Sequence, residues 1–272
     1  MPRSAVVALA AALLLAGCGG GGAPTSGPTD CVPPVVGHRG EPAVAPEETI
    51  ASFTAAIEDG AKTIEGDVHF TRDGQPVMLH DDTVDRTTDG TGRVSGKTLA
   101  QVESLDAGGW MGNEWKGVRV PTLEAFLHLA KTQDVHVIVE LKQPGATKAQ
   151  VRTFLSDITR AGMAKRTIVE SFYAGNLKTV HGLNPSMQTA LVTSTPVTPT
   201  EARSLGDALL PRLSIATPAR VKAWQGAGVK VYPWTADTEA QWAEAAKAKV
   251  DGVLTNRTTD YVAWARERCQ QD

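Results

Sequence analysis

The sequence predicts an α/β fold, a (β/α)₈ TIM barrel, from the order of its elements and from its length. Short apolar runs rich in β-branched residues alternate with amphipathic segments of helical length, as expected for parallel strands joined by helical crossovers. The 272 residues, less an N-terminal leader, have the length of one barrel domain. Eight strands are expected, at residues 35–38, 63–69, 135–142, 167–172, 187–192, 208–215, 229–234 and 250–255.

Helices are expected between most of these strands, for example at residues 48–59, 148–161, 218–226, 239–247 and 260–268. A ninth apolar run, 76–81, follows the second strand too closely for a parallel crossover. We therefore expect a short hairpin with its turn at Asp73 and Gly74, which would place His80 opposite Gly66. Residues 83–119 are rich in glycine and lack a sustained period, so we expect a loop-rich insertion that caps the barrel mouth.

The N-terminus has the features of an exported lipoprotein. Arg3 precedes a short apolar stretch, and residues 15–18, Leu-Ala-Gly-Cys, resemble the lipobox of bacterial lipoproteins. The apolar stretch is too short to cross ~30 Å of hydrocarbon as a stable helix. We expect residues 1–17 to be a signal peptide, Cys18 to carry the lipid, residues 18–30 to form a Gly/Pro/Ser/Thr tether, and residues 31–272 to fold. The protein would then sit on the outer face of the bacterial cytoplasmic membrane or in the cell envelope.

The net charge bears on the possible binding partners, and the two remaining cysteines bear on a possible disulfide. A formal net charge of -3 offers no cationic surface for nucleic acid, and a monomer is the default assembly.

Cys31 precedes the first strand and Cys269 ends the last helix. Export would place both in an oxidising compartment, and a closed barrel brings its first and last strands together. A Cys31–Cys269 disulfide is therefore considered, with two free thiols as the alternative.

Acidic residues gather on two of the expected strands. Glu65 and Asp67 are two apart, so both side chains project from one face, and Glu140 lies near the end of another strand. Carboxylates within about 5 Å repel by about 3 kcal/mol per pair at an effective dielectric of 20. We favour neutralisation by one divalent cation, and all-oxygen ligation suits Mg²⁺ or Ca²⁺. A network neutralised by Arg39 and Lys142 is the alternative.

Two histidines are placed for acid and base chemistry. His38 ends the first strand and His80 ends the hairpin arm, so both are expected to face the barrel mouth. In-line cleavage of a phosphodiester needs a base on the attacking oxygen and an acid on the leaving oxygen. Histidines on either side of a metal-held phosphate could supply both, although a single histidine is more often structural.

Four further residues are candidates for substrate binding. Arg39 offers a planar fork and Lys142 a point charge to a phosphate, and a purely charge-balancing role is equally consistent with the sequence. Phe172 and Trp234 end the fourth and seventh expected strands and would line the mouth. Packing in the core is the alternative for both aromatic residues.

The order of motifs along the chain resembles that of the glycerophosphodiester phosphodiesterases. These motifs are His38-Arg39-Gly40, Pro46-Glu47-Glu48-Thr49, Glu65-Gly66-Asp67-Val68, Thr71-Arg72-Asp73-Gly74, Val77-Met78-Leu79-His80-Asp81, Arg86-Thr87-Thr88, Glu140-Leu141-Lys142, Ser171-Phe172, Tyr232-Pro233-Trp234-Thr235 and Asp251-Gly252-Val253-Leu254-Thr255. The resemblance implies a PLC-like phosphodiesterase barrel that hydrolyses glycerophosphodiesters to sn-glycerol 3-phosphate and an alcohol. By the positions of these motifs, the resemblance also implies metal ligation by Glu65, Asp67 and Glu140, acid and base catalysis by His38 and His80, and phosphate contacts by Arg39 and Lys142.

Two departures from the family pattern stand out. Glu48 occupies a position where the family usually has Asn, and Asn256-Arg257 replaces a usual Asp-Pro. We expect Glu48 to alter headgroup preference and Asn256 at most to weaken a polar contact. Lysophospholipid or cell-wall polymer diesters are alternative substrates for the same site, and a tethered domain that only binds phosphodiesters is an alternative from another functional class.

Overall fold

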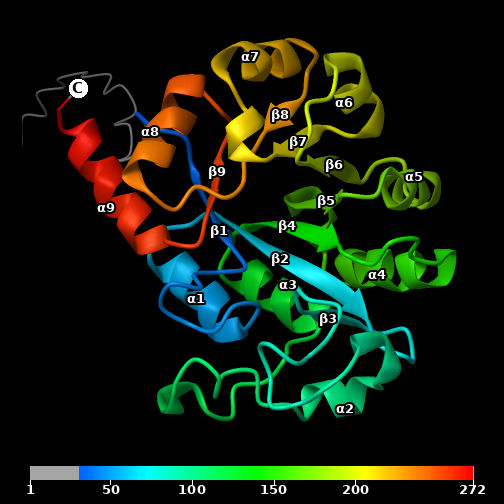
Figure 1. Ribbon diagram of the computed structural model, residues 1–272. Coiled ribbons are helices and arrows are strands. Elements are labelled where there is room, and N and C mark those ends of the chain that lie inside the picture. The colour runs from blue at the N-terminus through cyan, green and yellow to red at the C-terminus, as the bar shows by residue number, and fades with distance from the viewer. Residues whose placement is uncertain (1–30, 272) are drawn as a thin grey trace, which may run out of the picture.

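A computed structural model describes residues 31–271, which form a ring of parallel strands surrounded by helices (Figure 1). The strands follow the order β8-β7-β6-β5-β4-β2-β1-β9, and β3 pairs antiparallel with β2. The predicted TIM-barrel fold is confirmed. The strands are β1 (Val35–His38), β2 (Thr63–Phe70), β3 (Pro76–Met78), β4 (His136–Leu141), β5 (Thr167–Ser171), β6 (Gln188–Thr193), β7 (Ala208–Pro211), β8 (Lys230–Val231) and β9 (Val253–Thr255).

The ring closes irregularly between β8 and β9. The amide of Asp251 donates to the carbonyl of Val231 at 2.9 Å, and that of Leu254 donates to the carbonyl of Pro233 at 3.1 Å. Pro233 has no N–H to donate, and the amide of Val231 donates to the Asp251 carboxylate instead. β8 is therefore shorter than the expected 229–234. β7 also ends early, because the chain turns after Pro211 into the 3₁₀ helix η4 (Leu213–Ile215).

Helices cover the outside of the ring (Figure 1). Threonine hydroxyls accept amide hydrogen bonds at the start of α1, α3, α4, α6 and α8, which satisfies first-turn N–H groups that have no partner within the helix. The helices are α1 (Ile50–Glu58), α2 (Leu99–Glu103), α3 (Leu123–Thr132), α4 (Lys148–Arg160), α5 (Ala174–Leu183), α6 (Pro199–Leu205), α7 (Pro218–Gly226), α8 (Glu239–Ala248) and α9 (Thr258–Cys269), with short 3₁₀ turns such as η3 (Ala164–Arg166).

Side chains alternate across each strand, and this alternation separates the core from the pocket. One face of the strands packs against the helices in the larger apolar cluster, which includes Phe53 and Phe126. The other face fills the ring with a smaller cluster that contains Val36 and Ile138. Because the strand period is two, Glu140 points into the ring one layer above Ile138. Polar residues thus meet at the carboxyl ends of the strands.

The predicted hairpin forms with the expected register. Val68 pairs with Met78, and the amide of Leu79 donates to the carbonyl of Asp67 at 2.9 Å. This register brings His80 level with Gly66, as expected, and therefore next to the acidic residues of β2.

The insertion at residues 83–119 lies beside the mouth, so the expectation of a cap over it is wrong. The segment contains η1 (Val94–Gly96), α2 and η2 (Asn113–Trp115). Its apolar residues pack sideways on the hairpin, where Val84, Val94 and Val102 join Val77 and Leu79 in a separate small core. Residues 83–119 do not line the pocket described below, but Arg93 and Ser95 line an adjoining groove.

A disulfide joins Cys31 to Cys269, with Cα atoms 5.5 Å apart and a sequence separation of 238. It ties the residues before β1 to the end of α9, at the end of the barrel remote from the carboxyl ends of the strands. A loop of this length contributes about 5 kcal/mol of stability from chain entropy alone, as an upper value. Cys18 and the expected signal peptide and tether, 1–30, lie outside the described residues.

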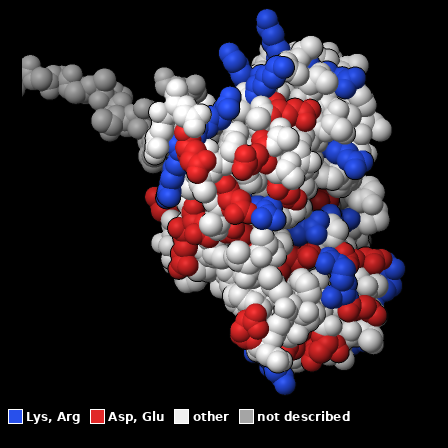
Figure 2. All heavy atoms as spheres, turned by 60° about the vertical axis from the view of Figure 1, so that its left-hand side comes forward, with Lys and Arg blue, Asp and Glu red and all other residues white. Residues whose placement is uncertain are grey.

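Charge is mixed on the face shown in Figure 2, where acidic and basic side chains are interspersed. Over residues 31–271, we find no helix with the length and apolar character needed to span a bilayer.

Candidate active site

A pocket of about 190 Å³ lies at the carboxyl ends of the strands. Every sequence-predicted catalytic, metal and substrate residue contributes to its wall, and the strand registers explain why. His38 pairs with Glu65 across β1 and β2, and Asp67 pairs with Glu140 across β2 and β4. The lining residues are His38, Arg39, Glu65, Asp67, His80, Glu140, Lys142, Glu170, Phe172, Val192, Leu210, Trp234 and Leu254.

The three predicted metal-binding carboxyl groups are almost fully buried. Glu65 and Asp67 are 2% exposed and Glu140 is 5% exposed. Burial and the Asp67 charge raise the pKa of Glu140 to about 8 and that of Glu65 well above its usual range. Burial also disfavours the Asp67 anion, but Lys142 and Arg39 outweigh it and hold the pKa of Asp67 below its usual value. Asp67 is therefore the carboxylate most firmly held in its anionic form.

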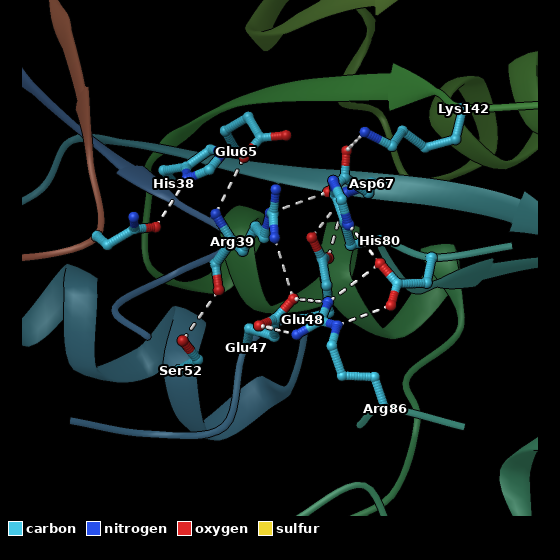
Figure 3. A network of polar contacts seen from close by, with 12 residues as sticks. His38, Arg39, Glu47, Glu48, Ser52, Glu65, Asp67, His80, Arg86 and Lys142 are labelled. Atoms are coloured by element: carbon cyan, nitrogen blue, oxygen red, sulfur yellow. Dashed lines mark hydrogen bonds and ion pairs between the residues drawn. The ribbon is translucent and has the colours of Figure 1, made fainter. Parts of the chain in front are cut away.

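Arg39 and Lys142 are the cations of the pocket, and both contact Asp67 (Figure 3). Arg39 Nε lies 3.3 Å from Asp67 Oδ2, and Lys142 Nζ lies 3.4 Å from Asp67 Oδ1. The amide of Arg39 also donates to Glu65 Oε2 at 3.0 Å, while Lys142 Nζ donates to Glu140 Oε2 at 3.0 Å. The two cations therefore hold together the acidic residues of two strands.

The loop after β1 aims Arg39 by an uncommon backbone geometry. Arg39 has φ 57° and Glu48 has φ 59°, a left-handed conformation that non-glycine residues seldom adopt. Gly40 follows with φ 82°, and a side chain there would collide with Ser52 in α1. The Ser52 hydroxyl donates to the Arg39 carbonyl at 2.9 Å. Helix α1 thus fixes the loop that presents Arg39.

The donor set of this pocket suits a hard divalent cation. Glu65, Asp67 and Glu140 supply only oxygen, and Asp67 Oδ2 is buried with the ion pair to Arg39 Nε but makes no hydrogen bond. As they stand, no three acidic, histidine or cysteine side chains among residues 31–271 converge tightly enough to enclose an ion. Arg39 and Lys142 contact the carboxylate oxygens instead. The residues fit a cation chemically, and the contacts of Arg39 and Lys142 with the carboxylates would have to rearrange to complete the site.

His38 is held by an amide that is itself fixed. His38 Nδ1 lies 2.7 Å from Asn256 Oδ1, and Asn256 Nδ2 donates to Asp237 Oδ2 at 2.8 Å. Because the Asn256 amide group points its oxygen at His38, Nδ1 carries the proton and Nε2 is left as an acceptor. Burial first, and then the Arg39 charge, lower the pKa of His38 to about 4. The His38 imidazole is therefore uncharged near neutral pH.

His80 is held by a carboxylate. Its Nδ1 lies 2.7 Å from Asp81 Oδ1, and Arg86 Nε donates to Asp81 Oδ2 at 2.7 Å. Arg86 also donates to both Glu47 carboxylate oxygens at 2.8 Å, which links the start of the insertion to the first loop (Figure 3). Burial lowers the pKa of His80, while the charge of Asp67 and the hydrogen bond to Asp81 oppose this shift.

The pocket wall has two parts, an acidic arc that contains Glu65, Asp67 and Glu140 and an apolar arc that lies opposite. Phe172 and Trp234 pack edge to face with ring centroids 5.6 Å apart, and Trp234 Nε1 donates to the Leu210 carbonyl at 2.9 Å. Val192 and Leu210 complete this wall. Phe172 stays 40% exposed, so its expected place at the mouth agrees with the structure, whereas Trp234 is half-buried.

Three residues make contacts at or beside the pocket that the sequence did not predict. Glu170 lines the pocket although it was not singled out on its strand. The single N–H of Asp67 donates to both Glu48 carboxylate oxygens, at 3.1 and 3.2 Å, so Glu48 supports β2 and does not line the pocket. Asn256 holds a predicted catalytic histidine, which is more than the minor polar contact expected. The sequence shows that Asn256 departs from the family pattern, but it does not show that Asn256 contacts His38, which lies 218 residues away.

The pocket combines buried carboxyl groups, two imidazoles and two cationic side chains at the carboxyl ends of barrel strands. This combination is typical of a phosphodiester hydrolase. Comparison with known proteins identifies the family of phosphodiester hydrolases to which the chain belongs. The model of the Glycerophosphoryl diester phosphodiesterase family matches residues 38–260, and the chain belongs to this family. It is therefore an enzyme of the phosphoric diester hydrolase class.

Individual relatives agree with this assignment. The chain is 34% identical over 230 residues to a glycerophosphodiester phosphodiesterase of Caldanaerobacter subterraneus subsp. tengcongensis, covering 82% of this chain and 93% of the relative. The structure of a glycerophosphodiester phosphodiesterase from Agrobacterium tumefaciens superposes with a TM-score of 0.77 at 28% identity, covering 85% of this chain and 100% of that one. An Oleispira antarctica phosphodiesterase, solved with the product sn-glycerol-3-phosphate, gives 0.80 at 26% identity, covering 86% and 96%.

Proposed function

We propose that this enzyme hydrolyses glycerophosphodiesters to sn-glycerol 3-phosphate and an alcohol with the help of one divalent cation, Mg²⁺ or Ca²⁺. The observation that carries the proposal is the division of the pocket into an acidic, cation-bearing arc and an apolar arc. The first suits a phosphate and hydroxyl groups, and the second suits a short carbon chain. The product bound to the Oleispira antarctica relative has this combination of groups.

Glu65, Asp67 and Glu140 would hold the cation, which when bound would offset their charge and draw electron density from the phosphate. Arg39 and Lys142 bind the phosphate oxygens and orient the phosphorus between the two imidazoles. Because these cations already contact Asp67, substrate binding exchanges part of that contact for contact with phosphate.

The hydrogen-bond partners of the two histidines support different roles for the two rings. His38 Nε2 accepts the proton of the attacking oxygen, which belongs to a glyceryl hydroxyl or to water, because burial and the Arg39 charge keep the ring neutral and the Asn256 amide holds the ring proton on Nδ1. His80 gives a proton to the leaving alcohol oxygen, because the Asp81 carboxylate stabilises its imidazolium form. When a glyceryl hydroxyl attacks first, water completes hydrolysis with the two roles exchanged.

Purified enzyme is expected to release sn-glycerol 3-phosphate from glycerophosphocholine, with activity lost on chelation and restored by Mg²⁺ or Ca²⁺. An enzyme-coupled assay of the product measures this directly. A lysophospholipid and a glycerol phosphate polymer, tested beside it, identify the alternative substrates. Tight binding of glycerophosphocholine without turnover in any divalent cation would instead establish a binding protein.

Asn256→Asp is expected to move the acidic limb of the kcat/KM profile to higher pH. The added carboxylate lies against His38 and close to Asp237, and both negative charges favour the imidazolium. The pKa of His38 should rise from about 4 by at least about one unit, so that less neutral base remains under mildly acidic conditions. Asn113→Asp, an exposed position in the insertion, is the matched control. An unshifted limb in Asn256→Asp would remove His38 from the role of base.

We also propose that the enzyme is exported and attached to the membrane through a lipid on Cys18. The support is the lipobox-like pattern and, independently, the disulfide, which suits an oxidising compartment. Cys18→Ala is expected to abolish metabolic labelling with a radioactive fatty acid and to release the enzyme from the membrane fraction. Equal membrane association of the two forms would contradict the proposal.

A further inference from the structure

Glu170 is a buried acidic residue that the proposed reaction does not use. It is 2% exposed, lines the pocket, and pairs in register with Glu140 across β4 and β5. Its Oε2 atom has no hydrogen-bond partner within residues 31–271. A buried carboxyl oxygen without a hydrogen-bond partner is costly, so its presence calls for a ligand that reaches it.

The position of Glu170 around the ring indicates what that ligand is. The acidic and cationic residues come from the β1, β2 and β4 side, and the apolar residues Val192 and Leu210 come from β6 and β7. Strand β5 lies between β4 and β6, so Glu170 ends the polar arc where the apolar arc begins. A group that meets Glu170 must donate a hydrogen bond and must be attached to carbon that packs on the apolar wall.

The terminal hydroxyl of a glyceryl group meets both conditions. A phosphate bound at Arg39 and Lys142 places the ester carbon and the neighbouring hydroxyl near the three carboxylates of β2 and β4. The third carbon then extends toward β5, and its C–H groups can pack against Phe172 and Trp234. We propose that Glu170 determines specificity by accepting a hydrogen bond from this terminal hydroxyl; the inference rests on the proposed glycerophosphodiesterase function.

The test compares two substrates that differ only at the terminal carbon. Glycerophosphocholine carries the hydroxyl, and the phosphocholine diester of propane-1,2-diol has a methyl group there but keeps the hydroxyl next to the phosphate ester. We expect the wild type to prefer glycerophosphocholine by roughly 100-fold in kcat/KM, because an analogue without the hydroxyl leaves the carboxylate unpaired. In Glu170→Leu the preference should fall below about fivefold, mainly through slower turnover of glycerophosphocholine.

Glu170→Gln keeps an acceptor oxygen and should retain an intermediate preference. Val192→Ala, on the neighbouring strand of the same pocket, is the matched control and should change the rates for both substrates by a similar factor. Melting temperatures report folding, and that of Glu170→Leu should not fall, because the change removes an unpaired buried carboxyl.

Calorimetric titration with Mg²⁺ and with Ca²⁺ separates the proposed role from metal ligation. Affinity for both ions should stay within about threefold of wild type in Glu170→Leu, and a large loss would make Glu170 a metal ligand and overturn the inference. An unchanged substrate preference in Glu170→Leu would overturn it as well. If the wild type hydrolysed neither diester, the proposed function itself would fail.

Discussion

Glu65→Gln is expected to lose both the divalent cation and the activity. Glu65 is buried beside Asp67 and Glu140, and an amide carries no charge to balance a cation. Replacing groups that only support metal ligands already costs 10- to 100-fold in affinity, so the loss of a ligand should cost at least about 100-fold. Calorimetry with Mg²⁺ and Ca²⁺ gives the affinity, and the coupled product assay gives the rate.

Glu103→Gln serves as the control, because Glu103 is exposed in α2 and lies outside the pocket. Because burial and the Asp67 charge already favour the uncharged form of Glu65, metal-free Glu65→Gln should be no less stable than the wild type, which distinguishes loss of the cation from unfolding. Unchanged ion affinity in folded Glu65→Gln would rule out Glu65 as a ligand.

His80→Ala is expected to lower kcat by about 10²- to 10⁴-fold while the cation remains bound. Without the imidazole, no group is left to protonate the leaving oxygen, and the carboxylates of β2 and β4 are untouched. The loss should be smallest for a diester whose leaving group is a nitrophenolate, since that group departs without a proton. Steady-state kinetics with glycerophosphocholine and with a nitrophenyl diester measure this difference.

His38→Ala should show a similar loss with both substrates, because the base acts on the attacking oxygen whatever the leaving group. His181→Ala, an exposed position in α5, is the control for histidine removal in general. If His80→Ala slowed both diesters equally while His38→Ala spared the nitrophenyl diester, the acid and base assignments would have to be exchanged.

Local patterns predicted most of the barrel and the centre of its pocket. Alternation along one strand was enough to place Glu65 and Asp67 on the same face, and the short turn at Asp73 and Gly74 was enough to bring His80 back beside them. Both predictions depend on periods of a few residues, which the sequence displays directly.

Features that depend on distant partners could not be predicted in this way. Glu170 lies in a short apolar run, and only the ring order shows that it ends the acidic arc. Residues 83–119 carry a small core of their own whose other half is supplied by the hairpin, so their sideways packing is invisible in their local pattern. The shortened β8 follows from where Pro233 meets β9, a contact made only when the ring closes.

The disulfide marks the base of the barrel, because Cys31 comes before β1 and the pocket lies beyond its other end. The proposed lipid on Cys18 would therefore be attached to the chain on the side of that base. The pocket opens at the other end of the barrel, away from the proposed attachment. Diesters that diffuse in the surrounding water would then enter freely, whereas lipids still embedded in the leaflet below would face the wrong end of the molecule.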